Sequence, residues 1–186
     1  MDKMNNATRQ TLALLVDNEP GVLSQIARLF SRKGYNIEAF AAGQTENPGV
    51  TRITIDVMAD DPHTELLCNQ LRKLYPVHSV KRLNDTSSIY RELMLIKVRA
   101  ATSERRNDVI QLANIFRAQI IDVSLETLTL GIFGDDEKLK GLEDILKEFE
   151  ILEIVRTGVI AIERGISTIN DKSKESGEFN YGKNVL

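Results

Sequence analysis

Cysteine and histidine, which often carry out catalysis or bind metals, are scarce in this sequence of 186 residues, which contains one cysteine and two histidines. The single cysteine, Cys68, excludes an internal disulfide and any metal site built from several thiolates. The histidines, His63 and His78, lie in no catalytic motif, and the G-x-S-x-G, H-E-x-x-H, G-x-G-x-x-G and Walker lysine patterns are absent. The sequence therefore indicates no enzyme, and we expect Cys68 to be a packed core residue.

An excess of positive charge and long apolar segments are also missing. The net charge is -3, whereas proteins that bind nucleic acid by neutralising phosphates need a basic face. No apolar run approaches the roughly 18 residues that would cross a bilayer. The polar N-terminal segment MDKMNNATRQ has no signal-peptide core. We therefore expect a cytoplasmic protein that binds neither nucleic acid nor membranes.

Hydrophobic spacing divides the first half of the chain into strands and helices. The run TLALLV is almost entirely apolar, which predicts a strand buried on both faces, whereas TRITIDV alternates and predicts one buried and one polar face. Gly34 is placed to end the first helix, and Asp60 to cap the second. The predicted elements are a strand at 11–16, a helix at 20–33, strands at 35–42 and 51–57, a helix at 60–75 and a strand at 77–83.

The same order of elements repeats in the second half. Apolar residues recur at helical spacing after Thr102 and again after Asp135, and β-rich runs flank both segments. The predicted elements are a strand at 92–100, a helix at 103–116, strands at 119–125 and 127–134, a helix at 135–150 and a strand at 155–165. We expect one unit at 9–84, a linker NDTSS, a second unit at 88–166 and a disordered polar tail at 170–186.

Two tandem βαββαβ units predict an α+β fold of the ferredoxin-like topology, in which two helices cover one face of a four-stranded antiparallel sheet. RNA-recognition domains share this topology, but they stack bases on aromatic side chains of the central strands. The two central strands here, TLALLV and TRITIDV, contain no aromatic residue. Ferredoxin-like metal carriers need two thiols in the first loop, and this loop has none.

The loop DNEPG before the first helix carries the groups that could bind a small anion. A helix N-terminus presents unpaired N–H groups, and Gly21 would let a ligand carboxylate approach the N–H groups of Val22 and Leu23. The side-chain oxygen of Asn18 could accept a hydrogen bond from an ammonium group. These groups, with an apolar wall from Val16, Val22 and Ile37, would suit a branched α-amino acid.

A simpler interpretation of this loop is structural. Asn18 could cap the helix, Pro20 could occupy its first turn, and Gly21 could only turn the chain. The spacing of these residues leaves both interpretations open.

The residues that follow the loop carry a recognisable pattern. The segment TLALLVDNEPGVLSQIARLFSRKGYNIEAF is similar to the family motif E-N-x-x-G-x-L-x-R-x-x-x-L-F-x-R-R-G-Y/F-N-I. RELMLIKV, FRAQIIDVS and RTGVIAIERG follow in register, so the likeness extends from about Arg9 to Gly165. The chain resembles the small, regulatory subunits of acetolactate synthase, whose N-terminal unit is an ACT domain.

This resemblance implies a subunit that does no chemistry and holds no cofactor. Such subunits bind a catalytic large subunit, in which thiamine diphosphate, magnesium and FAD are expected. They raise its activity and confer feedback inhibition by a branched-chain amino acid, usually valine, within branched-chain amino acid biosynthesis. The resemblance leaves open which amino acid is preferred and which surface contacts the large subunit.

The resemblance also implies a site shared between two protomers. In ACT dimers of this kind the sheets join edge to edge, so the first loop of one chain faces the start of the second strand of the other. The site would consist of Asn18, Gly21, Val22 and Leu23 from one protomer and of Asn36 and Ile37 from the other. Two alternatives remain open, namely a stand-alone amino-acid sensor for another enzyme or a transcription factor, and an enzyme with an unrecognised site.

Overall fold

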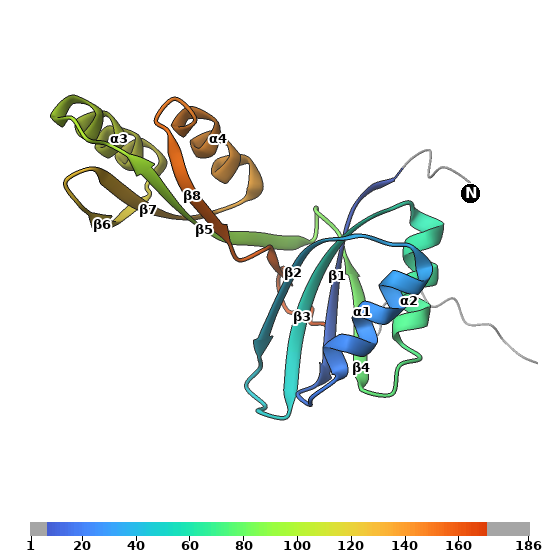
Figure 1. The fold of residues 1–186 in the computed structure, drawn as a ribbon. Helices are drawn as coiled ribbons and strands as arrows, with labels where there is room; N and C mark the ends of the chain where they lie inside the picture. The colour runs from blue at the N-terminus through green and yellow to red at the C-terminus, as the bar shows by residue number, and fades with distance from the viewer. Residues whose placement is uncertain (1–6, 171–186) are drawn as a thin grey trace, which may run out of the picture.

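The computed structural model describes residues 7–170, and the rest of the tail predicted to be disordered, residues 171–186, lies outside the described residues. Two antiparallel sheets each carry two helices on one face (Figure 1). This arrangement confirms the predicted α+β fold of two tandem βαββαβ units. The elements are β1 Thr8–Asp17, α1 Val22–Lys33, β2 Ile37–Gln44, β3 Val50–Ala59, α2 Asp61–Leu71, β4 Val77–Leu83, β5 Ser88–Arg99, α3 Ser103–Phe116, β6 Gln119–Val123, β7 Thr127–Gly134, α4 Asp136–Leu146, β8 Ile151–Arg156 and β9 Ile160–Glu163.

The first sheet has the strand order β2-β3-β1-β4, and α1 and α2 cover one of its faces (Figure 1). Leu12 and Leu14 of β1 lie opposite Ile55 and Ile53 of β3, and all four side chains belong to the apolar core beneath the helices. Ala13 points to the other face and is fully buried as well. The predicted burial of β1 on both faces is therefore confirmed.

The second face of β3 is polar, as its alternating pattern predicts, but most of it is covered. Thr54 is only 4% exposed and Asp56 only 1% exposed. Thr54 faces residues of the second unit, and the carboxylate of Asp56 is held by the side chains of Arg9 and Thr11 of β1. Arg52, on the same face of β3, donates a hydrogen bond to the backbone carbonyl of Ala161 in β9, at 2.8 Å.

Capping residues mark the end of α1 and the beginnings of α2 and α4. Gly34 adopts the left-handed conformation, with φ 73°, at the C-cap of α1. The carboxylate of Asp60 accepts a hydrogen bond from the backbone N–H of His63 at 2.9 Å, and that of Asp135 accepts one from Lys138 at 3.0 Å. Asp60 and Asp135 each begin a pair of adjacent acidic residues, with Asp61 and Asp136, and their capping contacts explain both pairs without a catalytic role.

The second sheet has the strand order β6-β7-β5-β8, with α3 and α4 on one face (Figure 1). The strand predicted at 155–165 is divided into β8 and β9, and β9 pairs with the N-terminal half of β5. Between them Gly158 has a φ of 76°, and a Cβ at this position would lie 3.3 Å from the carbonyl oxygen of Phe40. The division occurs where the chain turns against β2 of the first unit.

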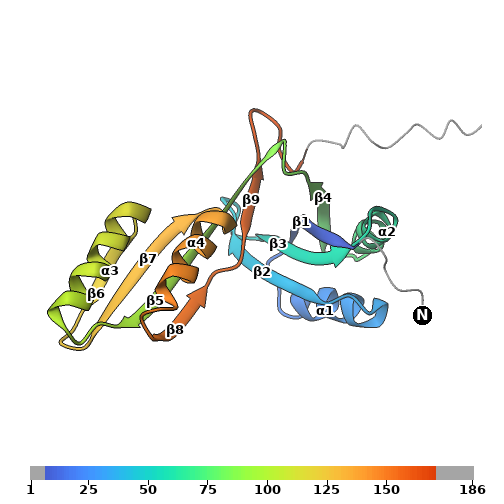
Figure 2. The same cartoon turned by 90° about the horizontal axis from the view of Figure 1, so that it is seen from above.

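An apolar cluster joins the two units. Ala13 and Leu83 of the first sheet pack with Val159, Ala161 and Ile169 from the end of the described chain. In Figure 2, β9 extends from the second unit toward β4, which it contacts. The open face of the first sheet is thus partly covered by the segment that follows β8.

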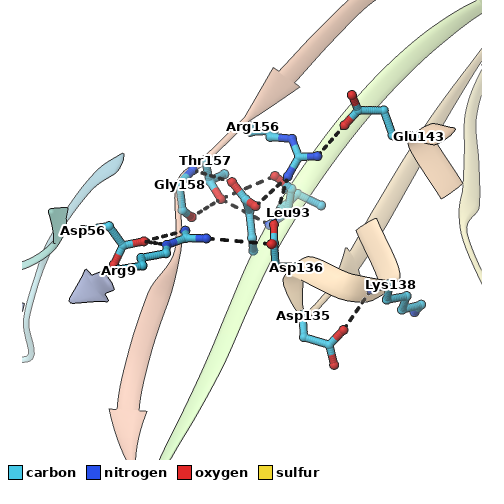
Figure 3. Close-up of polar contacts among 11 residues, drawn as sticks. Arg9, Asp56, Leu93, Asp135, Asp136, Lys138, Glu143, Arg156, Thr157 and Gly158 are labelled. Atoms are coloured by element: carbon cyan, nitrogen blue, oxygen red, sulfur yellow. Dashed lines mark hydrogen bonds and ion pairs between the residues drawn. The ribbon is translucent and has the colours of Figure 1, made fainter. Parts of the chain in front are cut away.

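Charged groups form a second connection between the units (Figure 3). Arg9 of β1 binds the buried carboxylate of Asp56, with an Nη2 to Oδ2 distance of 2.6 Å. Asp136, the first residue of α4, lies 3.8 Å from Arg9 and 3.8 Å from Arg156 of β8. Arg156 in turn binds Glu92 of β5 at 3.1 Å. A carboxylate of the second unit therefore lies between an arginine of each unit.

Candidate functional site

The loop between β1 and α1, residues 17–21, is held to neighbouring loops at its N-terminal end. The backbone N–H of Asp17 donates to the carbonyl of Pro76 at 2.9 Å, and that of Asn18 donates to the carbonyl of Gly49 at 2.8 Å. Gly21 then takes a φ of 90° and serves as the N-cap of α1. This left-handed conformation favours glycine, and a Cβ placed there would meet nothing within 4 Å.

The structural interpretation of this loop proves wrong in two respects. Asn18 does not cap α1, because within the described chain this helix has no side-chain cap and its N-cap residue is Gly21. Pro20 lies before the N-cap and not in the first turn of the helix. The first turn of α1 also contains no acidic residue.

The N-terminus of α1 therefore has unused hydrogen-bond donors. The N–H of Val22 makes a long bond of 3.4 Å to the carbonyl of Glu19. Within residues 7–170, the N–H groups of Leu23 and Ser24 have no hydrogen-bond acceptor. Free N–H groups and the partial positive charge of the helix end together favour a bound anion.

A hollow of about 320 Å³ opens beside this helix end. Its floor includes Val16 and Val22, which are 1% and 4% exposed, and Leu23 at its rim is 49% exposed. Its size lies at the lower end of the range of about 300–1,000 Å³ that is common for small-molecule pockets. The residues that line the hollow are Val16, Asp17, Asn18, Glu19, Val22, Leu23, Ala42, Gly43, Gln44 and Thr51.

Two contacts fix the amide of Asn18 at the wall of the hollow. Its Nδ2 donates to the carbonyl of Pro48 at 2.9 Å, and its Oδ1 accepts from the hydroxyl of Thr51 at 3.1 Å. The oxygen keeps a second lone pair, because an amide oxygen can accept two hydrogen bonds. Asn18 could therefore accept a bond from a ligand without losing its contact with Thr51.

The six predicted site residues are only partly brought together within one chain. Asn18, Val22 and Leu23 line the hollow, and Gly21 directly precedes Val22. Asn36 and Ile37 lie at the opposite end of β2, because Ile37 is paired with Val57 near the far end of β3. There Asn36 donates to Glu38 at 2.8 Å and Ile37 packs against the apolar core, so Ile37 does not form the predicted wall within its own protomer.

Sequence reasoning missed the contribution of the hairpin between β2 and β3. Ala42, Gly43, Gln44 and Thr51 form one side of the hollow. The sheet order places this hairpin beside the end of β1. The predicted topology was therefore sufficient to place the hairpin next to the loop DNEPG. The acidic side of the hollow was also missed, and its Asp17 carboxylate lies 2.7 Å from Nε2 of His78.

No group of three or more histidine, cysteine, aspartate or glutamate side chains within residues 7–170 could hold a metal ion. None of the helices in that range is long and apolar enough to span a lipid bilayer.

Comparison with known proteins identifies relatives for nearly the whole described chain. Residues 12–79 match the family described as the AHAS small subunit-like ACT domain, and residues 91–165 match the family described as the small subunit of acetolactate synthase. A probable acetolactate synthase small subunit from Methanothermobacter thermautotrophicus is 41% identical over 158 residues, which cover 85% of this chain and 94% of the relative.

Two further relatives agree with this match. An acetolactate synthase small subunit from Mycolicibacterium smegmatis is 42% identical over 163 residues, covering 87% of this chain and 95% of the relative. The crystal structure of an acetolactate synthase small subunit from Thermotoga maritima is similar with a TM-score of 0.80 at 36% identity, covering 85% of this chain and 98% of that chain. The chain therefore belongs to the family of acetolactate synthase small subunits, with an ACT domain as its first unit.

Proposed function

We propose that this chain is the regulatory subunit of an acetolactate synthase. It binds a catalytic large subunit, raises the activity of that subunit, and makes it sensitive to inhibition by a branched-chain amino acid, with valine as the first candidate. The chain itself is non-catalytic, and thiamine diphosphate, magnesium and FAD belong to the large subunit. The observation that carries this proposal is the hollow at the free N-terminus of α1, in a chain that is similar to small subunits over most of its length.

The hollow has complementary groups for both charges of an α-amino acid. The N–H groups of Leu23 and Ser24 would bind the carboxylate. Asn18 Oδ1 and the carboxylates of Asp17 and Glu19 would receive the ammonium group. The buried faces of Val16 and Val22 would contact a branched side chain.

A second protomer would complete the site. β2 is the terminal strand of its sheet, so one edge of its backbone is unpaired in the single chain. Two β2 strands could pair antiparallel about a two-fold axis at the middle of the strand, between residues 40 and 41. This pairing would set residue 37 of one chain opposite residue 44 of the other. Asn36 and Ile37 would then approach the hollow beside Gln44, which explains why they lie far from it within one chain.

Binding across two protomers gives a mechanism by linkage. A ligand held by both chains favours one arrangement of the two ACT domains over others. A coupling free energy of about 1–3 kcal/mol would suffice for severalfold inhibition. By the same linkage, the inhibited state of the complex would bind the amino acid more tightly than the active state does.

The first test is reconstitution with a catalytic acetolactate synthase subunit. We expect the chain to increase acetolactate formation, valine to decrease it, and the chain alone to form none. An output unchanged by the chain, with and without valine, would overturn the proposal in favour of a stand-alone sensor. Output from the chain alone would identify an enzyme.

The second test concerns the position of the ligand. Gly21→Asp adds a carboxylate beside the free N–H groups of α1, so we expect valine inhibition to be lost while activation remains. Gly21→Ala is the matched control, because it imposes the same strain at φ 90° without the charge. If Gly21→Asp remains as sensitive to valine as Gly21→Ala, the amino acid does not bind at this helix end.

A further inference from the structure

A second hollow, of about 430 Å³, lies between the two units. Its floor is the face of the first sheet that points away from α1 and α2, where Arg52 and Thr54 alternate with the core residues of β3. Strands β5, β7 and β9 of the second unit form its other side. The residues that line it are Ala41, Ala42, Gly43, Gln44, Arg52, Thr54, Ile89, Arg91, Phe133, Ile160, Ala161 and Ile162.

Large apolar side chains line this hollow without being covered by the described chain. Phe133 and Ile162 are each 57% exposed, and Ile160 is 53% exposed. Soluble proteins tend to bury such groups, and exposed apolar side chains gathered in a concave surface between domains are typical of a binding site.

Two guanidinium groups border the same hollow. Arg52 donates to the carbonyl of Ala161 at 2.8 Å, and Arg91 donates to the carbonyl of Tyr90 at 2.6 Å. Arg91 pairs in the sheet with Ile160, so both arginines lie beside one short segment of β9. Among residues 7–170, no carboxylate lies within 4.0 Å of the guanidinium nitrogens of either arginine.

The position of Arg52 is costly for a positive charge. Partial burial lowers the pKa of its guanidinium, although the Glu163 carboxylate opposes this shift. That carboxylate is 2.6 Å from Lys81 and forms its ion pair there. An anion in the hollow would therefore interact with the half-buried guanidinium of Arg52, because the nearby carboxylate of Glu163 is paired with Lys81.

The charged side chains that line the two hollows have opposite signs. Asp17 and Glu19 line the hollow at α1, where they suit an ammonium group. The hollow between the units contains two arginines and no acidic residue in its lining. We propose that this second hollow binds an aliphatic carboxylate that has no ammonium group, with its carboxylate toward Arg52 and Arg91 and its chain against Phe133, Ile160 and Ile162. This proposal does not rest on the proposed amino-acid site, although Ala42, Gly43 and Gln44 border both hollows.

The position of binding can be measured with octanoate as the probe. In the full chain labelled at the δ1 methyl groups of isoleucine, octanoate should shift the NMR signals of Ile89, Ile160 and Ile162. The signals of the core residues Ile26 and Ile96 should not move. Octylamine, which has the same chain and the opposite charge, should leave all five signals in place. Equal shifts with octylamine, or no shift at the three lining residues, would overturn the proposal.

Variants test the role of charge by calorimetry. Arg91→Gln should weaken octanoate binding about tenfold, the loss expected when a hydrogen bond to a charged group is removed. Ala41→Leu should weaken it by filling the hollow. Arg105→Gln, at an exposed position of α3, is the matched control and should bind as the unmodified chain does.

A further variant separates the two hollows. Gly21→Asp should leave octanoate affinity unchanged, because this change lies at the first hollow. If Gly21→Asp abolishes octanoate binding, or if Arg91→Gln and Ala41→Leu retain full affinity, octanoate does not bind between the units. Failure of the valine experiments would leave this result untouched.

Discussion

At the scale of single residues, burial controls the chemistry of the cysteine. Cys68 lies in α2 and is 1% exposed, in the apolar core of the first unit. Burial raises the pKa of its thiol to about 11. A thiol with this pKa is neutral at physiological pH, and the neutral form is a poor nucleophile. The expected role as an inert core residue agrees with this environment.

The first prediction is that Cys68 resists thiol reagents until the protein unfolds. At pH 8 the native chain should react with 5,5′-dithiobis(2-nitrobenzoate) far more slowly than the chain unfolded in guanidinium chloride. In the native chain the reagent cannot reach the buried sulfur, and almost none of the thiol is ionised. The raised pKa also means that the neutral thiol stabilises the fold below about pH 9, and that this contribution disappears as the pH rises toward 11. Rapid reaction of the native chain at pH 8 would contradict this description.

Residues whose role depends on nearby backbone were predictable, whereas Asn18 was not. Gly34 and Asp60 each act on their own helix end, so local sequence contains the required information. The partners of Asn18, Pro48 and Thr51, lie 30 and 33 positions away along the chain. The sequence offered Asn18 a capping role, and only the packed hairpin shows why the side chain turns elsewhere.

At the scale of elements, the start of α2 depends on one carboxylate. Asp60 accepts hydrogen bonds from the backbone N–H of His63 and, at 2.6 Å, from the ring nitrogen Nδ1 of His63. The bond from the backbone N–H of His63 is the main reason why the pKa of Asp60 is lowered. Because the pKa of Asp60 is lower in the folded state, the cap stabilises the protein at pH values above the pKa that Asp60 has in the unfolded chain. This stabilisation is lost as the pH falls through the pKa of Asp60 in the folded state.

The second prediction follows from this sign. Asp60→Ala should lower the urea midpoint of unfolding at pH 7, where the carboxylate is charged. Near pH 2.5 the difference from the unmodified chain should become small, because protonation weakens the cap of the unmodified chain as well. Leu66→Ala, at an exposed position of the same helix, serves as a control for helix changes unrelated to the cap. A difference that stays constant between pH 7 and 2.5 would contradict the proposed role of charge.

Element order was more predictable than the limits of the last strands. Apolar patterns and the residues that end helices located the four helices of residues 7–170 and predicted eight strands where the structure has nine, which was close enough to give the topology. The division between β8 and β9 was not predictable, because it is caused by contact between Gly158 and the backbone of Phe40 in another unit. The burial of Thr54 and Asp56 also depends on residues distant in the sequence, because Thr54 faces the second unit and Asp56 is held by Arg9 and Thr11, which lie 47 and 45 positions away.

At the scale of the whole molecule, both hollows adjoin the same piece of chain. Ala42, Gly43 and Gln44 of β2 line the hollow at α1 and also the hollow between the units. The terminal strand thus separates the proposed amino-acid site from the second unit. A ligand in either hollow would therefore contact the strand that also borders the other hollow.

Arg9 connects the two units through charges of unequal exposure (Figure 3). Its partner Asp56 is 1% exposed, and Asp56 also accepts a hydrogen bond from the hydroxyl of Thr11 at 2.6 Å. Its second partner, Asp136, is 56% exposed and lies 3.8 Å away. A buried carboxylate that loses its cation costs much more than a broken exposed pair.

The third prediction uses this difference. Arg9→Ala should lower the free energy of unfolding by about 1–3 kcal/mol, less than the loss for a fully buried pair, because the side chain of Arg9 is 44% exposed and Thr11 still donates to Asp56. Asp136→Asn should lower it by about 0–1 kcal/mol, because water screens the exposed pair. Both values can be measured from urea unfolding followed by circular dichroism.

A double variant tests the reason for this difference. In a chain that already carries Asp56→Asn, no buried charge is left behind, so Arg9→Ala should lower the free energy of unfolding clearly less. If its cost is the same in both backgrounds, Arg9 stabilises the fold by packing and not by compensating the buried carboxylate.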